Sequence, residues 1–127
     1  LEGVAFGMRD SIEIMKGMGI PINEVRISGG GARSSLWRQI MADICKVPMV
    51  VINVDEGPAF GAALLASIAA GMFSSLSEAC EKIIKELYRV EPNQQNVEEY
   101  DFYYQEYKSV YLSLAPAFHR ISKKVEG

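Results

Sequence analysis

The residues that could do chemistry lie in the stretch Val25–Trp37, which holds three consecutive glycines and, shortly after them, two serines. The segment 25–28 is β-branched and apolar at alternate positions, which predicts a short buried strand. The glycines end this strand, and the serines are typical of the start of an amphipathic helix near Leu36. A strand, a glycine turn and a helix start leave backbone N–H groups at the positive end of a helix dipole, where phosphates bind. The pattern fits equally well a tight turn in which glycine serves only the backbone conformation, because Gly-Gly-Gly lacks the spacing of a P-loop or a dinucleotide fingerprint.

The composition narrows the possible function classes. The chain has 127 residues, 49% of them hydrophobic and 23% charged, which favours a single globular domain. A formal net charge of -3 without a basic cluster argues against a nucleic-acid partner. The longest apolar run, 62–70, is too short to span a membrane, and the N-terminal residues do not resemble a signal peptide. We therefore expect neither a nucleic-acid nor a membrane partner.

Histidine and cysteine give two further expectations. A single histidine makes a His-based metal site improbable, and we predict no metal ligands in this chain. Cys45 and Cys80 both fall in helical patterns, which predicts free, buried thiols in a reducing compartment. We therefore expect a cytoplasmic location.

The elements that must position the glycine turn follow from hydrophobic periodicity. The two expected strands, 25–28 and 47–52, are separated by a helix over 35–46 that buries Leu36, and so form one right-handed βαβ unit. The remaining helices are expected over 1–18, 59–70, from Ser74 or Ser75 to Leu87, and 97–125 with a bend near Pro116, with a polar loop over 90–96. Two parallel strands do not make a free-standing sheet, and the chain begins without Met inside an apolar helix. We therefore expect a piece of a longer α/β protein.

Several side chains near the turn or in the last helix allow two interpretations. Trp37 is either core packing or the wall of a ligand pocket. Asp43 is expected on a helix face that mixes core and solvent, with a structural role. Asp55 and Glu56 precede a helix start, where carboxylates complement the dipole, although Glu56 could instead coordinate a ligand. The tyrosines of the last helix recur at helical spacing and predict a docking face onto the same domain.

These segments together resemble a known family. The run Ser28–Asp43 resembles the Gly-rich segment of the FGGY carbohydrate kinases, and among them most closely that of the xylulokinases. The run Glu56–Ala63 is similar to the helix start that follows in that family, and Leu1–Gly3 to the helix that closes an upstream signature. The tail from Val90 to Tyr107 resembles the closing helix. The similarity covers almost the whole chain.

The resemblance implies an actin-like ATPase fold of two ribonuclease-H-like domains that close over ATP. Residues 1–127 would be a mostly helical part of the C-terminal domain, on its nucleotide-binding side, with no complete second domain. By this resemblance Gly30, Gly31 and Ala32 contact the nucleotide through their backbone, and Ser35 through its side chain.

The resemblance also places the catalytic machinery elsewhere. The family uses an aspartate general base and Mg with ATP, and the base and the sugar pocket belong to segments upstream of Leu1. The expected catalytic residues of this chain are therefore none, and the chain alone should be inactive. Its partners would be ATP or ADP, the sugar, the rest of the parent chain and, in a homo-oligomer, further copies.

Two alternatives remain open at this stage. The chain could be a stand-alone module that binds a phosphate-bearing ligand without chemistry. It could instead be a structural or dimerising lobe of an inactive relative. An aspartate motif upstream in the parent chain would distinguish the kinase from both.

Overall fold

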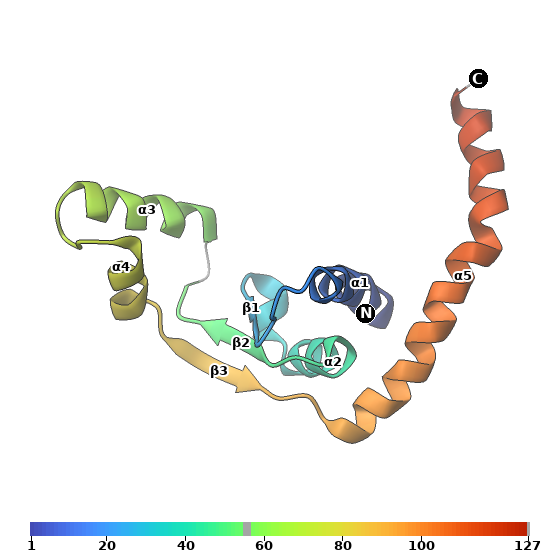
Figure 1. Ribbon diagram of the computed structural model, residues 1–127, viewed down its shortest axis with the longest axis horizontal. Helices are drawn as coiled ribbons and strands as arrows, with labels where there is room; N and C mark the ends of the chain where they lie inside the picture. Colours follow the sequence, from blue (N-terminus) through green and yellow to red (C-terminus); the bar gives the residue numbers. More distant parts are fainter. Residues whose placement is uncertain (55–56, 127) are drawn as a thin grey trace.

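The computed structural model describes residues 1–54 and 57–126 of the chain. Helices dominate it, and a small sheet lies at its centre (Figure 1). The elements in chain order are α1 (Glu2–Gly17), β1 (Val25–Ile27), the 3-10 helix η1 (Gly30–Arg33), α2 (Ser35–Cys45), β2 (Met49–Ile52), α3 (Gly57–Ala69), α4 (Leu76–Ile83), β3 (Glu86–Val90) and α5 (Gln94–Glu126).

The sheet contains the predicted βαβ unit. β1 and β2 pair in parallel, with Val25 opposite Met49, and α2 connects them. β2 is the central strand in the order β1-β2-β3 and is paired along both of its edges, and its first two residues, Met49 and Val50, are buried. The prediction of a parallel βαβ unit is confirmed.

The third strand was not expected from the sequence. We predicted a helix up to Leu87 and a loop from Val90, but α4 ends at Ile83 and β3 pairs antiparallel with β2. The side chain of Asn53 accepts a hydrogen bond from Lys85 N at 2.8 Å and donates one to the Ile83 carbonyl at 3.0 Å. These bonds hold the chain extended just where a helical pattern would have continued. The sheet is therefore mixed.

The core lies on one face of this sheet, where α1, α2 and α5 meet (Figure 1). Phe6 of α1 is at its centre, with ring centroids 6.2 Å from Tyr100, 6.1 Å from Tyr104 and 5.4 Å from Tyr107. The predicted docking of the α5 tyrosines is confirmed for these three residues. The buried residues of the core are Ala5, Phe6, Ile12, Met41, Ala42, Ile44, Cys45, Val47, Met49 and Tyr104.

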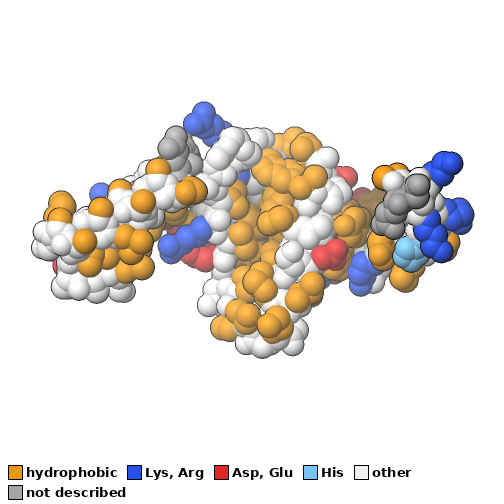
Figure 2. Space-filling model, turned by 90° about the horizontal axis from the view of Figure 1, so that it is seen from above, with side chains coloured by type: hydrophobic (Ala, Val, Ile, Leu, Met, Phe, Trp, Pro, Cys, Tyr) orange, Lys and Arg blue, Asp and Glu red, His pale blue; other side chains and the backbone are white. Residues whose placement is uncertain are grey.

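Other apolar positions remain on the surface. The second half of α5 projects from the body and leaves Tyr111 exposed, and Leu36, which we predicted to be buried in α2, is 62% exposed. α3 and α4 form a pair on the opposite side of the sheet from α5. Figure 2 shows apolar side chains on the surface of this pair, of the central body and of the end of α5. Within residues 1–54 and 57–126, no helix combines the length and apolarity needed to cross a membrane.

Candidate functional site

The glycine turn is a short 3-10 helix rather than an open loop. Gly29 precedes it with φ +79°, a left-handed conformation that glycine adopts without strain. The Ala32 N–H donates to the Gly29 carbonyl at 3.1 Å, and the Ser34 N–H donates to the Gly31 carbonyl at 3.2 Å. Gly30 and Gly31 are exposed on its outer side, whereas Ala32 is buried. The turn therefore has a fixed backbone and an accessible glycine edge.

The two serines after the turn have different places. Ser34 is the N-cap of α2, and its hydroxyl accepts a hydrogen bond from Trp37 N at 3.2 Å. Ser35 is the first residue of the helix and is exposed. The N–H groups of Ser35 and Leu36 lie in the first helical turn, where a helix offers no acceptor of its own. They lie at the positive end of the α2 dipole, a position that favours anions.

Trp37 fills the space beside Gly31. A Cβ atom at Gly31 would lie 3.1 Å from both Cδ1 and Nε1 of the Trp37 indole, which is tighter than normal packing. Trp37 also packs against the core on its other side. The absence of a side chain at Gly31 thus lets the indole pack against the turn. The interpretation of Trp37 as core packing is confirmed, and Trp37 is not among the residues that line the pocket beside the turn.

A pocket of about 460 Å³ opens beside the turn. Ala32 and Arg33 from the turn, Arg38 from α2, Asn53 after β2 and Tyr88 from β3 contribute to its wall. It lies at the carboxyl end of β2, and ligands of α/β proteins bind outside the carboxyl ends of parallel strands. Arg38 brings a cationic side chain to the wall of this pocket, which suits an anionic ligand.

Arg38 and Tyr88 are the site residues that the sequence reasoning missed. The Arg38 guanidinium donates from Nη1 to the Ala32 carbonyl at 2.6 Å and lies 5.2 Å from the centroid of the Tyr88 ring. The position of Arg38, one turn into a helix that follows a glycine turn, was a usable signal. Tyr88 could not be found, because it lies on the strand that the sequence pattern assigned to a helix.

Asp43 is buried rather than on a mixed face. Its side chain is 1% exposed and accepts hydrogen bonds from Asn93 N at 2.7 Å, Asn96 Nδ2 at 2.8 Å and Gln39 Nε2 at 2.7 Å. Asn93 in turn precedes α5 and accepts a hydrogen bond from Gln95 N. Asp43 therefore ties α2 to the start of α5. The other two carboxylates of the prediction, Asp55 and Glu56, lie outside the described residues.

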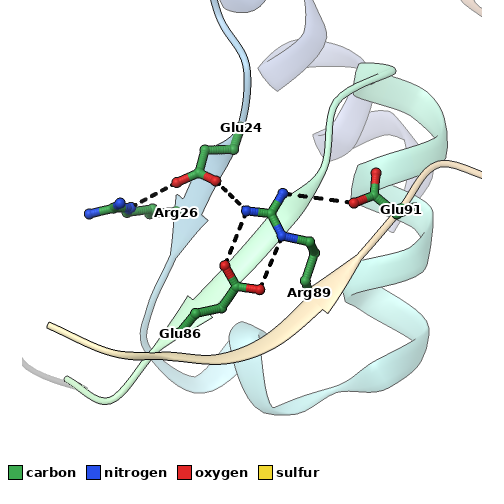
Figure 3. Close-up of polar contacts among 5 residues, drawn as sticks. All are labelled: Glu24, Arg26, Glu86, Arg89 and Glu91. Carbon is green, nitrogen blue, oxygen red and sulfur yellow. Dashed lines mark hydrogen bonds and ion pairs between the residues drawn. The ribbon is translucent and has the colours of Figure 1, made fainter.

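An exposed ion network crosses the sheet away from the turn (Figure 3). Arg89 on β3 reaches Glu24 beside β1 at 2.5 Å and Glu86 at 3.0 Å, and Glu24 also pairs with Arg26 at 3.0 Å. Hydrogen bonds from Arg89 and then Arg26 lower the pKa of the Glu24 carboxyl. The network joins the outer strands β1 and β3 across β2. It is a structural feature of the sheet and belongs to no pocket that includes the glycine turn.

The other titratable groups do not form a second chemical centre in the described part of the chain. No group of three or more His, Cys, Asp and Glu residues within it could hold a metal ion. Cys45 and Cys80 are free, and burial raises the pKa of the Cys45 thiol to about 11. A thiol with such a pKa is a poor nucleophile near neutral pH.

The four residues predicted to contact the nucleotide lie close together in the chain: Gly30, Gly31 and Ala32 are in η1, and Ser35 is the first residue of α2. Gly30, Gly31 and Ser35 are exposed. Ala32 has both backbone groups occupied, since its N–H bonds Gly29 and its carbonyl accepts from Arg38. It can therefore offer a ligand only van der Waals contact through its backbone.

Comparison with known proteins assigns this architecture to a family. The profile of the FGGY family of carbohydrate kinases, C-terminal domain, matches residues 1–70. The chain belongs to this family, and its fold is part of the C-terminal actin-like ATPase domain. The resemblance found in the sequence is thereby confirmed.

Several members of this family that are similar to the chain are xylulose kinases. The chain is 37% identical over 111 residues to a xylulose kinase of Bacillus subtilis, covering 87% of this chain and 22% of that protein. It is 36% identical to a xylulose kinase of Escherichia coli, over 91% of this chain and 24% of the relative. The crystal structure of a xylulose kinase from Rhodospirillum rubrum superposes with a TM-score of 0.80 at 29% identity, over 93% of this chain and 24% of that one. The chain thus spans about a quarter of the length of the relatives it matches.

Proposed function

We propose that this chain is the nucleotide-binding C-terminal portion of an ATP-dependent sugar kinase of the xylulokinase type. The observation that carries the proposal is the turn Gly29–Arg33, whose exposed glycines adjoin both the α2 N-terminus and a pocket lined by Arg38. The names of the most similar relatives favour a ketopentose such as xylulose as the acceptor. An ATP-dependent enzyme of this kind would work in the cytoplasm.

The residues present fit a nucleotide phosphate. The N–H groups of Gly30 and Gly31 and those of the first turn of α2 would donate to phosphate oxygens, and the Ser35 hydroxyl would add a side-chain contact. Ala32 would form the floor of the site by van der Waals contact. ATP supplies the phosphoryl group when it is bound, and the contribution of this chain is to orient the nucleotide.

The residues that the structure describes do not fit a magnesium site. Among residues 1–54 and 57–126 no cluster of carboxylates could hold the ion, and the carboxylate of Asp43 is engaged with three donors. A general base must reach the sugar hydroxyl, and the buried Asp43 cannot do so. In line with the family resemblance, we place both the base and the Mg²⁺ ligands in the remainder of the complete kinase, and expect the 127-residue chain alone to be inactive.

The test is an assay of sugar-dependent ADP formation by the complete kinase. D-xylulose, gluconate and glycerol should be compared as acceptors, because xylulose, gluconate and glycerol kinases are all among the relatives. We expect the highest kcat/KM with xylulose and no turnover by the isolated chain. ATP binding without turnover of any acceptor would favour the non-catalytic binding module. A complete protein that neither binds ATP nor turns over any acceptor would favour a structural or dimerising lobe.

A further inference from the structure

We propose that Arg38 is a positioning residue for the nucleotide, which acts by fixing the peptide plane of the glycine turn. This inference rests on the proposed nucleotide-binding function. The Arg38 side chain reaches back from α2 and donates from Nη1 to the Ala32 carbonyl at 2.6 Å, six residues earlier in the chain. The bond is charge-assisted and therefore stronger than a bond between neutral groups.

The bond sets the direction of the neighbouring amides. In a trans peptide the C=O and the N–H point in opposite directions, and the peptide bonds described here are all trans. Holding the Ala32 carbonyl toward Arg38 therefore turns the N–H of the same peptide, that of Arg33, away from the Arg38 guanidinium. Because Ala32 and Ser34 also bond back to Gly29 and Gly31, a rotation of this peptide would disturb the whole turn.

Two consecutive residues of α2, Trp37 and Arg38, contact the turn. Trp37 lies against Gly31, where a Cβ would come within 3.1 Å of the indole, and Arg38 holds Ala32. The Arg38 guanidinium also lies over Tyr88, with its Cζ 5.2 Å from the ring centroid. This cation–π contact restrains the guanidinium and links the turn to the edge strand β3.

The hydrogen bonding of Arg38 is incomplete. Its Nε is buried and has no hydrogen-bond partner among the described residues. A buried donor without a partner is destabilising, so an arginine kept only for stability would be poorly placed here. A guanidinium that holds a phosphate-binding turn and adds positive charge to the pocket beside it accounts for this position.

The experiment compares ADP with adenosine binding to the complete kinase, by calorimetry, in four proteins: wild type, Arg38→Met, Arg38→Lys and the distant control Arg120→Met. Only ADP carries phosphates, so a residue that positions the phosphate-binding turn should affect ADP selectively. We expect Arg38→Met to lower the affinity for ADP by at least about tenfold, the effect of losing one charged hydrogen bond, and to leave the affinity for adenosine unchanged. Arg38→Lys keeps the charge and one donor but not the planar contact with Tyr88, and should give an intermediate loss. Arg120→Met should bind both ligands as the wild type does.

Equal ADP affinity in the wild type and in folded Arg38→Met and Arg38→Lys would overturn the inference, as would an equal loss for ADP and adenosine. Circular dichroism checks folding, and if Arg38→Met does not fold, the selective ADP loss must appear in Arg38→Lys alone. Wild-type ADP affinity in Arg38→Lys would show that the positive charge alone matters, and would also overturn the positioning role of Arg38. A wild-type kinase that binds neither ligand would instead refute the proposed function. A Gly31→Val variant that loses ADP while both Arg38 variants retain it would refute only the role of Arg38.

Discussion

Substitution of Asp43 tests whether this carboxylate has a structural or a catalytic role, because a carboxylate in this segment could be taken for a general base. The structure gives it a different role, since it accepts hydrogen bonds from Gln39, Asn93 and Asn96 and so fastens the start of α5. Asp43→Ala removes the acceptor of all three. Asp43→Asn retains one oxygen, and the Asn96 amide can turn over to accept from the new NH₂ group.

The expected loss of stability in Asp43→Ala follows from the burial of the three donors that Asp43 accepts from. The backbone N–H of Asn93 would lose its acceptor in a partly buried setting, and an unsatisfied buried donor costs about 1–3 kcal/mol. Gln39 and Asn96 are half-buried, so water can replace part of their lost hydrogen bonds. The remaining cost is about 0.5–1 kcal/mol for each of these two side chains. The total of about 3 kcal/mol for Asp43→Ala corresponds to a roughly hundredfold easier local opening of α5. Asp43→Asn should change this opening by less than about tenfold.

Native-state hydrogen exchange of the complete kinase measures this opening directly. The amides in the first turns of α5 should lose protection in Asp43→Ala, whereas those of α4, which supplies none of the three donors that bond Asp43, serve as the internal control. In the folded protein kcat should stay within about tenfold of wild type, since a general base contributes about 10²–10⁴ in rate. Unchanged exchange in α5 would refute the anchoring role. A thousandfold loss of kcat with α5 still protected would show that Asp43 takes part in the chemistry.

Three further outcomes are expected. Gly31→Val forces a branched side chain against the Trp37 indole, and in the complete kinase it should raise KM for ATP by about tenfold or more without changing KM for the sugar. A change in the sugar KM alone would assign the turn to the other substrate. The isolated 127-residue chain exposes many large apolar side chains and should self-associate. A compact monomer in sedimentation velocity, with no binding of an apolar dye, would contradict this. Burial alone would raise the pKa of Asp101, but its hydrogen bonds and ion pairs with Lys46 and Arg9 together lower it, so the stability that it contributes is present at neutral pH and lost as the pH falls below about 4. Thermal melts of wild type and Asp101→Asn from pH 6 to pH 3 should therefore converge at the acid end, and a constant difference would exclude this linkage.

The local part of the fold could be predicted from the sequence. Strand β1, the glycine turn, α2 and strand β2 follow one another within about thirty residues, and each has its own signal in residue type and periodicity. The same segment carries the Gly-rich part of the family resemblance and all four predicted contact residues. Parallel pairing of β1 and β2 then follows from the single helix between them.

The remainder depends on contacts between distant segments. Leu87 continues the apolar spacing of α4, and only pairing of Glu86–Val90 with β2 makes this segment a strand. Asp43 is buried because Asn93 and Asn96, about fifty residues later, bring donors to it. The capping role of Ser34 rather than Ser35 depends on where the 3-10 helix ends. No periodicity in the sequence contains this information.

The central claim is that the turn Gly29–Arg33 holds the nucleotide of a sugar kinase. A crystal structure of the complete kinase with bound ADP tests it most directly. The account predicts phosphate oxygens within about 3 Å of the N–H groups of Gly30 and Gly31, with the Ser35 hydroxyl beside them and Arg38 still bonded to the Ala32 carbonyl. Nucleotide phosphates bound elsewhere in the protein, with this turn facing only solvent or neighbouring protein, would contradict it.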